Sequence, residues 1–207
     1  MSSTKDKILD TAERLFSEQG FAGTSLRQII AEAGVNLAAI HYHFGSKEVL
    51  LEELIQRVAV PINTARLAKL EGYEGEAGSG PVPVAKILEA FLVPAAEWAA
   101  EHPASIRLIG RLHAEAMTPA VAERHFKPTG MRFLEALRRS LPQLSERELG
   151  WRFEFMLGAM AMAMTGTLVP LFGGAEDRQG RVECLVAFIS GGFLARATRQ
   201  QEVETSK

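Results

Sequence analysis

The amino-acid sequence predicts an all-α protein of about nine helices, and three observations lead to this prediction. Apolar residues recur with the three- and four-residue spacing of a helix along most of the 207 residues. No segment keeps the two-residue alternation of a half-buried strand over the length of a strand. Hydrophobic residues make up 47% and charged residues 23% of the chain, which excludes the disordered and fibrous classes.

The first two predicted helices are delimited by glycines and capping residues. The apolar stripe of the first helix consists of Ile8, Leu9, Ala12, Leu15 and Phe16. Gly20 follows as a natural left-handed stop. A second helix begins at Thr24 or Ser25, where Ser25 and Gln28 have the spacing of a capping box, and it ends at Gly34. Its inward face consists of Leu26, Ile29, Ile30 and Ala33.

The third helix is short and the fourth is long. Asn36 caps the third helix, and Gly45 closes it. Its inward residues are Leu37, Ile40 and Phe44. The fourth helix opens at Ser46, and Pro61 is expected to kink or split it because proline lacks the amide donor, with the helix resuming from Ile62 to Leu70. Residues 72–83 hold four glycines and two prolines, which predicts a loop.

Further helices are expected beyond this loop. They cover about 84–101, 104–117, 119–141 with a break near Pro128, 145–169, and a final apolar stripe from Leu185 to Phe193, with a loop at 172–179. The segment from Phe155 to Ala175 carries no charge, but glycines and Pro170 interrupt it and no cluster of Lys or Arg flanks it. We therefore expect a buried packing helix and no membrane span.

The net charge and the cysteine content exclude few classes of function. The single cysteine, Cys184, cannot form an internal disulfide, and the N-terminal residues carry no apolar stretch of a secretory signal, so we expect a cytoplasmic protein. The net charge is −2, and residues 1–60 hold six Lys or Arg against eight Asp or Glu. DNA binding must therefore rest on local geometry and not on bulk charge.

Residues 24–45 are the most informative part of the sequence. The segment Ala33-Gly34-Val35-Asn36 joins two short helices by a turn too tight for antiparallel packing, which is the arrangement of a helix-turn-helix. The outward residues of its second helix are Ala38, Ala39, His41 and Tyr42. Small side chains allow close approach to base edges, and His41 can contact a guanine or a thymine methyl. Helix-turn-helix geometry also occurs in proteins that never touch DNA.

Two segments here resemble the tetracycline-repressor-type (TetR-like) transcriptional regulators. They run from Ala22 to Asn36 and from Ile40 to Leu51, and the most recognisable part is Tyr42-His43-Phe44-Gly45-Ser46-Lys47-Glu48. The resemblance covers about residues 5–55. It implies phosphate contacts by Thr24, Tyr42, His43 and Lys47, and base reading by residues 36–42. His41 stands where many members carry tyrosine or asparagine, which leaves the preferred DNA sequence open.

From the residues and the resemblance together, we expect residues 1–48 to form the DNA-binding domain and residues 49–207 to bind an effector and form the dimer. The expected DNA-binding residues are Thr24, Ser25, Arg27, Gln28, Asn36, Leu37, Ala38, Ala39, His41, Tyr42, His43 and Lys47. Arg27 and Gln28 lie early on the second helix, within reach of the DNA backbone. Lys47 lies in the first turn of the fourth helix, where its charge suits a docked anion.

The larger domain offers residues for a dimer interface and for an effector site. The expected interface residues are Gly158, Ala159, Ala163, Gly166, Phe188, Gly192 and Phe193, because small side chains allow close helix approach and phenylalanines supply area. The expected effector residues are Phe91, Trp98, Arg107, Arg111, His113, Met156 and Met160. Both sets have plainer interpretations, as ordinary core or, for the arginines, as a solvated face.

These features predict a ligand-responsive transcriptional regulator, most simply a repressor. It would bind a palindromic operator in double-stranded DNA as a homodimer and be released by a small apolar effector, with acyl-chain-like molecules among the candidates. The alternative is a helical module that binds lipids or other hydrophobic ligands without any DNA function. An enzyme is not expected, since the sequence has no Gly-rich phosphate loop, no Cys/His ligand set and no nucleophile elbow. We accordingly expect no metal and no cofactor.

Overall fold

The computed structural model describes residues 3–115, 119–165 and 177–197, with only the backbone given for 111–115, 119, 165 and 178. Within these residues the chain forms ten helices and no strand, which confirms the all-α prediction. The helices are α1 (Thr4–Gly23), α2 (Leu26–Ala33), α3 (Leu37–His43), α4 (Lys47–Ala77), α5 (Val84–Glu101), α6 (Pro103–Glu115), α7 (Pro119–His125), α8 (Lys127–Ser140), α9 (Glu146–Thr165) and α11 (Arg178–Leu194).

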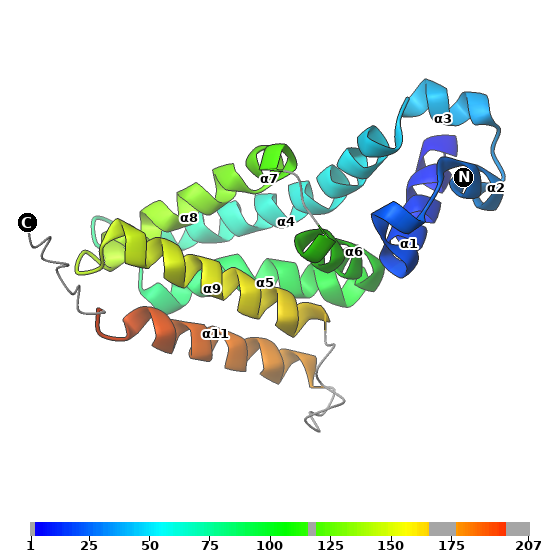
Figure 1. Cartoon of the computed structure of the whole chain (residues 1–207). Coiled ribbons are helices and arrows are strands. Elements are labelled where there is room, and N and C mark those ends of the chain that lie inside the picture. The colour runs from blue at the N-terminus through cyan, green and yellow to red at the C-terminus, as the bar shows by residue number, and fades with distance from the viewer. Residues whose placement is uncertain (1–2, 116–118, 166–176, 198–207) are drawn as a thin grey trace, which may run out of the picture.

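Figure 1 shows α1, α2 and α3 at one end of an elongated molecule, with α4 leading from them along the larger helical part. These three helices and the start of α4 enclose a core whose fully buried side chains include Ile8, Phe16, Ile40 and Leu54. Leu108 of α6 joins this core, so the N-terminal helices rest on the larger part of the chain. This contact fixes where α3 lies relative to α6.

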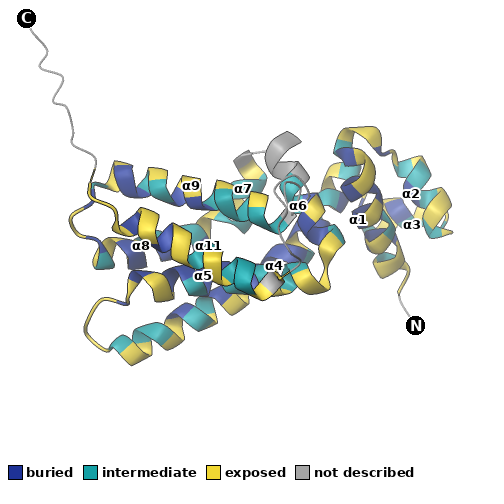
Figure 2. Cartoon of the chain, turned by 90° about the horizontal axis from the view of Figure 1, so that it is seen from below, coloured by how far each residue is buried: buried dark blue, intermediate teal, exposed yellow. Residues whose placement is uncertain are grey.

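The larger part packs α5 against α4 and α11, and α9 against α8 and α11. Its core centres on Phe91, whose ring lies edge-on to Phe133 and Phe153 with centroids 5.0 and 5.4 Å apart. Such edge-to-face pairs add to the stabilisation that comes from burying the rings. Figure 2 shows that buried and exposed positions alternate along these helices, as expected of helices packed on one side.

Two expected helix ends differ in the structure. Gly20 has the left-handed φ of 80° but kinks α1, which then continues to Gly23. The fourth helix runs through Pro61 to Ala77, so the predicted loop at 72–83 is shorter than expected.

The extension of α4 has a physical cause in the contacts of its last turns. The Tyr73 hydroxyl donates to Glu89 Oε1 (2.5 Å), and the Glu74 carboxylate pairs with Arg132 and Arg139 of α8. These tertiary contacts outweigh the low helix propensity of the two glycines in this segment. By contrast, the predicted break near Pro128 is confirmed, because α7 ends at His125 and α8 begins at Lys127.

Two expected absences concern the described residues. None of the helices they form is both long enough and apolar enough to cross a bilayer. No group of three His, Cys, Asp or Glu side chains among them is arranged to hold a metal ion. The end of the helix expected at 145–169 and most of the loop expected at 172–179 lie outside the described residues.

Candidate DNA-binding surface and effector cavity

The turn between α2 and α3 has the geometry of a helix-turn-helix. Gly34 has φ 65° and ψ 34°, a left-handed conformation that glycine adopts without steric cost. Asn36 then caps α3, with its side-chain Oδ1 accepting a hydrogen bond from the Ala39 amide at 2.8 Å. The short turn therefore holds α3 at a fixed angle to α2, as the spacing of these residues predicts.

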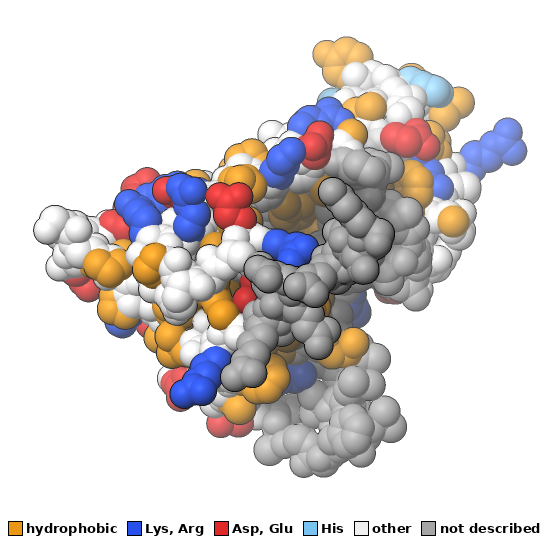
Figure 3. Space-filling view, turned by 60° about the vertical axis from the view of Figure 1, so that its left-hand side comes forward, with side chains coloured by type: hydrophobic (Ala, Val, Ile, Leu, Met, Phe, Trp, Pro, Cys, Tyr) orange, Lys and Arg blue, Asp and Glu red, His pale blue; other side chains and the backbone are white. Residues whose placement is uncertain are grey.

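The third helix buries one face and exposes the other. Ile40 is fully buried and the adjoining Phe44 is 4% exposed, whereas Tyr42 is 86% exposed. Leu37 is 55% exposed, so the expectation that it faces inward is wrong. Ala38 and His41 are also exposed, and Ala39 and His43 are partly buried. Figure 3 shows hydrophobic and histidine side chains at the outer tip of this end of the molecule. The outward face thus offers small, apolar and hydrogen-bonding groups and no carboxylate.

Thr24 does not lie where the resemblance implies. It is 2% exposed, and its hydroxyl donates to the carbonyl oxygens of Gly20 (2.9 Å) and Leu15 (3.3 Å). The reason is the kink at Gly20, which disturbs the regular backbone bonds of α1 and leaves a carbonyl for the threonine to bind. The expectation that the Thr24 side chain contacts phosphate is therefore wrong for this structure.

The neighbouring residues of α2 are partly engaged in local contacts. Ser25 Oγ accepts from the Gln28 amide (3.2 Å) and so caps the helix. The Gln28 side chain donates to Gln19 and to Glu32 (3.2 Å each), which holds it along the helix surface. Arg27 is exposed and has no ion pair with a described residue. Arg27 is therefore the cation on α2 that remains available to an anion.

Lys47 lies beside the junction of α1 and α2. Its Nζ is 4.1 Å from the centroid of the Phe21 ring, and Ser46 caps the helix that Lys47 begins. Two other cations of this end, Lys5 and Arg14, pair with carboxylates, but Lys47 pairs with none of the described ones. The unpaired positive charges near α3 are thus carried by a few residues, although the segment as a whole is slightly acidic.

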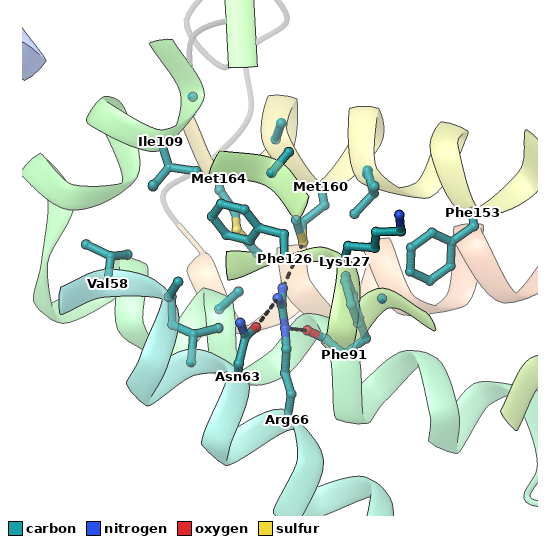
Figure 4. Close-up of a pocket in the computed structure, with 18 of the residues that line it drawn as sticks. Val58, Asn63, Arg66, Phe91, Ile109, Phe126, Lys127, Phe153, Met160 and Met164 are labelled. Atoms are coloured by element: carbon teal, nitrogen blue, oxygen red, sulfur yellow. Dashed lines mark hydrogen bonds between the residues drawn. The ribbon is translucent and has the colours of Figure 1, made fainter. Parts of the chain in front are cut away.

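A cavity of about 390 Å³ lies between α4, α5, α6, α7, α8 and α9, within the larger part of the chain (Figure 4). Its lining is mainly apolar, with Val58, Ile62, Phe91, Ile109, Phe126, Met160 and Met164 among the contributing side chains. The polar and charged lining residues are Asn63, Arg66, Glu123 and Lys127. A cavity of this size and character is typical of sites for small organic ligands.

Arg66 is the feature of this cavity that the sequence analysis missed. It is 5% exposed, its Nε donates to the Phe91 carbonyl oxygen (2.7 Å), and its guanidinium carbon lies 3.8 Å from the Phe91 ring centroid. Burial lowers the pKa of the Arg66 guanidinium to about 9, so the group is still charged at neutral pH. A signal was present in the sequence, because Val58, Ile62 and Leu70 place Arg66 in a buried stripe with a spacing of four.

The structure divides the expected effector residues. Phe91 and Met160 line the cavity. Met156 is 1% exposed in the core beside it, and Trp98 packs on a neighbouring cluster, so neither lines the cavity. Arg107 is exposed on α6 and does not line the cavity, so the expectation that it meets an effector there is wrong. The side chains of Arg111 and His113 lie outside the described residues.

The residues expected at a dimer interface also differ in their positions. Gly158 and Gly192 are exposed, Phe188 is 72% exposed, and Ala159 and Ala163 are partly buried. Phe193 is 1% exposed in the core of its own subunit, so the expectation that it supplies interface area is wrong. Gly166 lies outside the described residues. Further exposed apolar side chains on the same two helices are Trp151, Phe155, Met162 and Leu194.

A polar cluster of Glu13, Arg57 and Ser105, in which Glu13 and Ser105 are buried and Arg57 is partly exposed, connects the two parts of the molecule. Glu13 of α1 is 6% exposed, its carboxylate forms an ion pair with Arg57 of α4, and it accepts a hydrogen bond from Ser105 of α6. Arg57 also pairs with Asp10 (2.6 Å). The cluster therefore joins α1 to both α4 and α6, and both of these helices also line the cavity.

Comparison with known proteins begins with two family models. Residues 8–54 match the model described as bacterial regulatory proteins, tetR family, and residues 89–192 match the tetracyclin repressor-like C-terminal domain. The second match alone covers half of the chain.

Curated relatives match at the N-terminal end. The chain is 51% identical over 53 residues to the Bacillus subtilis protein named "Probable HTH-type transcriptional regulator YttP", covering 26% of each chain. It is 42% identical over 52 residues to IcaR of Staphylococcus aureus, named as an HTH-type negative transcriptional regulator of the biofilm operon icaADBC, covering 25% of this chain and 28% of IcaR. The chain thus spans about a quarter of the length of the curated relatives it matches. Both are named as transcriptional regulators and not as enzymes.

Solved structures match over almost the whole chain. A tetR family transcription regulator from Shewanella sp. PV-4 superposes with a TM-score of 0.68 at 25% identity, covering 92% of this chain and 98% of that one. The regulator PfmR from Thermus thermophilus superposes with a TM-score of 0.62 at 20% identity, covering 96% and 100%. Taken with the family models, these matches lead to one conclusion: the chain belongs to the TetR family of bacterial regulatory proteins.

Proposed function

We propose that this protein is a homodimeric transcriptional repressor that binds a palindromic operator through α3 and is released by a small, mainly apolar effector. The observation that carries the proposal is the arrangement of α3. This helix buries Ile40 and exposes His41 and Tyr42, and the same end of the molecule carries Arg27 and Lys47, neither of which has an ion pair with a described carboxylate. A helix so presented has the shape and surface that a major groove accepts.

The DNA-contacting residues have two roles in this proposal. Ser25, Arg27, Gln28, Tyr42, His43 and Lys47 contact phosphates, while Asn36, Leu37, Ala38, Ala39 and His41 lie against base edges. Phosphate contacts set affinity for any duplex, and base contacts set the preferred sequence. The cap formed by Asn36 orients the start of α3 toward the bases.

Dimerisation would occur through α9 and α11. Both helices carry exposed large apolar side chains, of which Phe155 is 70% and Phe188 is 72% exposed in the single chain. Gly158, Gly191 and Gly192 are open enough that a Cβ added to any of them meets no described atom within 4 Å. A two-fold pair of these helices would bury the phenylalanines, and the dimer would present two copies of α3 to successive turns of DNA.

Release by an effector requires that the cavity communicates with α3. In the proposed arrangement residues 1–48 move as the DNA-binding domain and residues 49–207 hold the cavity. The polar cluster of Glu13, Arg57 and Ser105 and the packing of Leu108 support such coupling, because α4 and α6 each touch both parts. A hundredfold loss of DNA affinity needs a difference of about 2.7 kcal/mol in effector affinity between the two arrangements.

The test is selection of duplexes from a random pool followed by gel shift at several salt concentrations. Wild type should retain one palindromic sequence with strong salt dependence. Tyr42→Ala and Lys47→Ala should weaken binding to every duplex, and His41→Ala should change the selected sequence. Lys86→Ala, on α5, is the matched control and should bind as wild type does. The proposal is wrong if wild type selects no sequence, which would leave the module without DNA function.

A further inference from the structure

Arg66 is buried in the cavity wall, and no described residue balances its positive charge. Among the described residues no carboxylate oxygen lies within 4.0 Å of its nitrogens, whereas Arg57, Arg132 and Arg152 each have such a partner. Burying an ionised side chain alone costs several kcal/mol, so proteins generally pair it or use it. The position of Arg66 in the wall of a cavity favours a role in binding a ligand.

The hydrogen bonds of Arg66 leave part of its fork open. A guanidinium has five N–H donors. Nε donates to the Phe91 carbonyl, Nη1 donates to Asn63 Oδ1 (3.3 Å), and Nη2 lies 3.5 Å from the weak acceptor Met160 Sδ (Figure 4). One N–H on each terminal nitrogen therefore has no partner among the described residues. A guanidinium can offer one N–H from each terminal nitrogen to the two oxygens of a carboxylate.

The group is also held in place before any ligand arrives. Its guanidinium lies against the face of Phe91, and Asn63, which accepts from Arg66, donates to the His125 carbonyl oxygen at 2.8 Å. Little rotamer freedom is then lost on binding, which strengthens the interaction.

The remaining charges of the cavity wall indicate a single negative charge on the ligand. Lys127 and Glu123 form an ion pair (2.8 Å), and their side chains are 59% and 64% exposed, so they lie at the solvent side and cancel each other. The described lining therefore carries one net positive charge, on Arg66. The rest of the wall is apolar, so an apolar body suits it.

We infer that the effector is a small monocarboxylate with an apolar body, whose carboxylate binds Arg66 and Asn63 while its body fills the space between Phe126, Met160 and Met164. The cavity of about 390 Å³ lies within the range of sites for small organic ligands, about 300–1,000 Å³, so a ligand of about a dozen non-hydrogen atoms is a suitable probe. Decanoate and 4-phenylbutanoate both have about this size. This inference rests on the proposed function only in calling the ligand an effector.

The experiment compares acids with their neutral analogues on the full-length protein without DNA. Trp98 packs on the cluster of Val58, Ile62 and Ala95, all of which line the cavity, so its fluorescence should report occupancy. Trp151 is the second of the two tryptophans and is half-exposed, and Trp151→Phe removes its background. Decanoate, 4-phenylbutanoate, their primary amides and decan-1-ol are titrated in turn.

At least one acid should bind about tenfold or more tightly than its amide, the difference expected of a charge-assisted hydrogen bond. In Arg66→Met this preference should fall to about one, while the affinity for decan-1-ol is kept. Arg66→Lys, which keeps the charge but not the fork, should show an intermediate preference. Arg107→Met, an exposed arginine outside the cavity, should behave as wild type.

Two results would overturn the inference: equal affinity of wild type for both acids and their amides, or an undiminished preference in Arg66→Met. The comparison of acids with amides on wild type needs no variant, so it tests the inference even if a substitution prevents folding. The apo Arg66→Met protein should melt no lower than wild type, because an unbalanced buried charge is removed. A failure of the proposed function gives a different result: the acid binds to the protein but does not change the gel shift.

Discussion

The N-terminal core and the effector cavity both lie between packed helices, yet they treat their polar groups in opposite ways. In the first region the side chains of Ser25, Asn36 and Ser46 each accept a hydrogen bond from a backbone amide. The buried Glu13 carboxylate pairs with Arg57 and accepts a hydrogen bond from Ser105. In the second region Arg66 is buried with no described carboxylate in reach. Within the described residues, the buried charge of the N-terminal core is therefore paired, whereas the buried charge of the cavity wall has no carboxylate partner, and in our inference a ligand supplies one.

The largest effect should come from the apolar core that supports α3. Phe44→Ala removes a side chain that is 4% exposed and should cost about 3–5 kcal/mol of unfolding free energy. Denaturant unfolding of the variant measures this loss, and gel shift should show DNA retention reduced with it. Tyr42→Ala, at a position 86% exposed, is the control and should change stability by less than about 0.5 kcal/mol while still weakening DNA binding. A large loss of stability in the control would mean that α3 does not face outward.

A substitution in the polar cluster of Glu13, Arg57 and Ser105 should lower the unfolding free energy by a smaller amount. Ser105→Ala takes one hydrogen-bond donor from the buried Glu13 carboxylate and should cost about 1.5–3 kcal/mol. It should also reduce the effect of a bound acid on DNA affinity, because α6 then holds α1 less firmly. Unfolding and gel shift with saturating ligand measure the two effects. Unchanged stability together with unchanged release would remove this cluster from the coupling path.

A third prediction concerns pH and the end of α4. The hydrogen bond from Arg132, assisted by Arg139, holds the pKa of the Glu74 carboxyl below its usual 4.5. Because the folded-state pKa is the lower one, the stabilisation is present above about pH 4.5 and is lost as the pH falls through the folded value. Glu74→Gln should therefore be less stable than wild type by about 1 kcal/mol at pH 7, and the gap should shrink toward pH 3. A gap that stays constant with pH would contradict this.

The smallest effect is a change in salt dependence. Lys47→Ala should leave stability within about 0.5 kcal/mol of wild type and lower the slope of log affinity against log salt by about one, as the loss of one phosphate contact predicts. Gel shift at four salt concentrations gives the slope. The same slope as wild type would show that Lys47 does not contact phosphate.

The same contrast explains which parts of the structure could be predicted from the sequence. Helix boundaries around α2 and α3 depend on Ser25, Gly34 and Asn36, whose effects act within four residues, and these predictions agree with the structure. The burial of Thr24 depends on a kink at Gly20, and the continuation of α4 past Gly72 depends on arginines of α8 more than fifty residues away. The arginine contacts are long-range and leave no local pattern, whereas the contact of Thr24 spans only four residues and depends on the backbone conformation that Gly20 adopts.

The cavity was harder still, because its wall is assembled from several helices that are far apart in the sequence. Phe91 and Met160 were expected there as members of an apolar interior, but the same composition also suggested Met156, which packs in the core. Arg107 was expected there because it lies on a largely apolar helix, yet it is exposed, and Arg66 was not among the expected residues. Only the three-dimensional packing decides which arginine is buried. The sequence did hold one indication that Arg66 is buried, because it continues a row of apolar residues that recur every fourth position along α4.

The central claim is that ligand binding at Arg66 and DNA binding by α3 oppose each other, and thermodynamic linkage tests it most directly. The affinity of the acid that binds most tightly is measured by titration on the free protein and on the protein saturated with its selected operator duplex. The account predicts that the duplex weakens acid binding by the same factor by which the acid weakens DNA binding. Equal acid affinity with and without the duplex would contradict it.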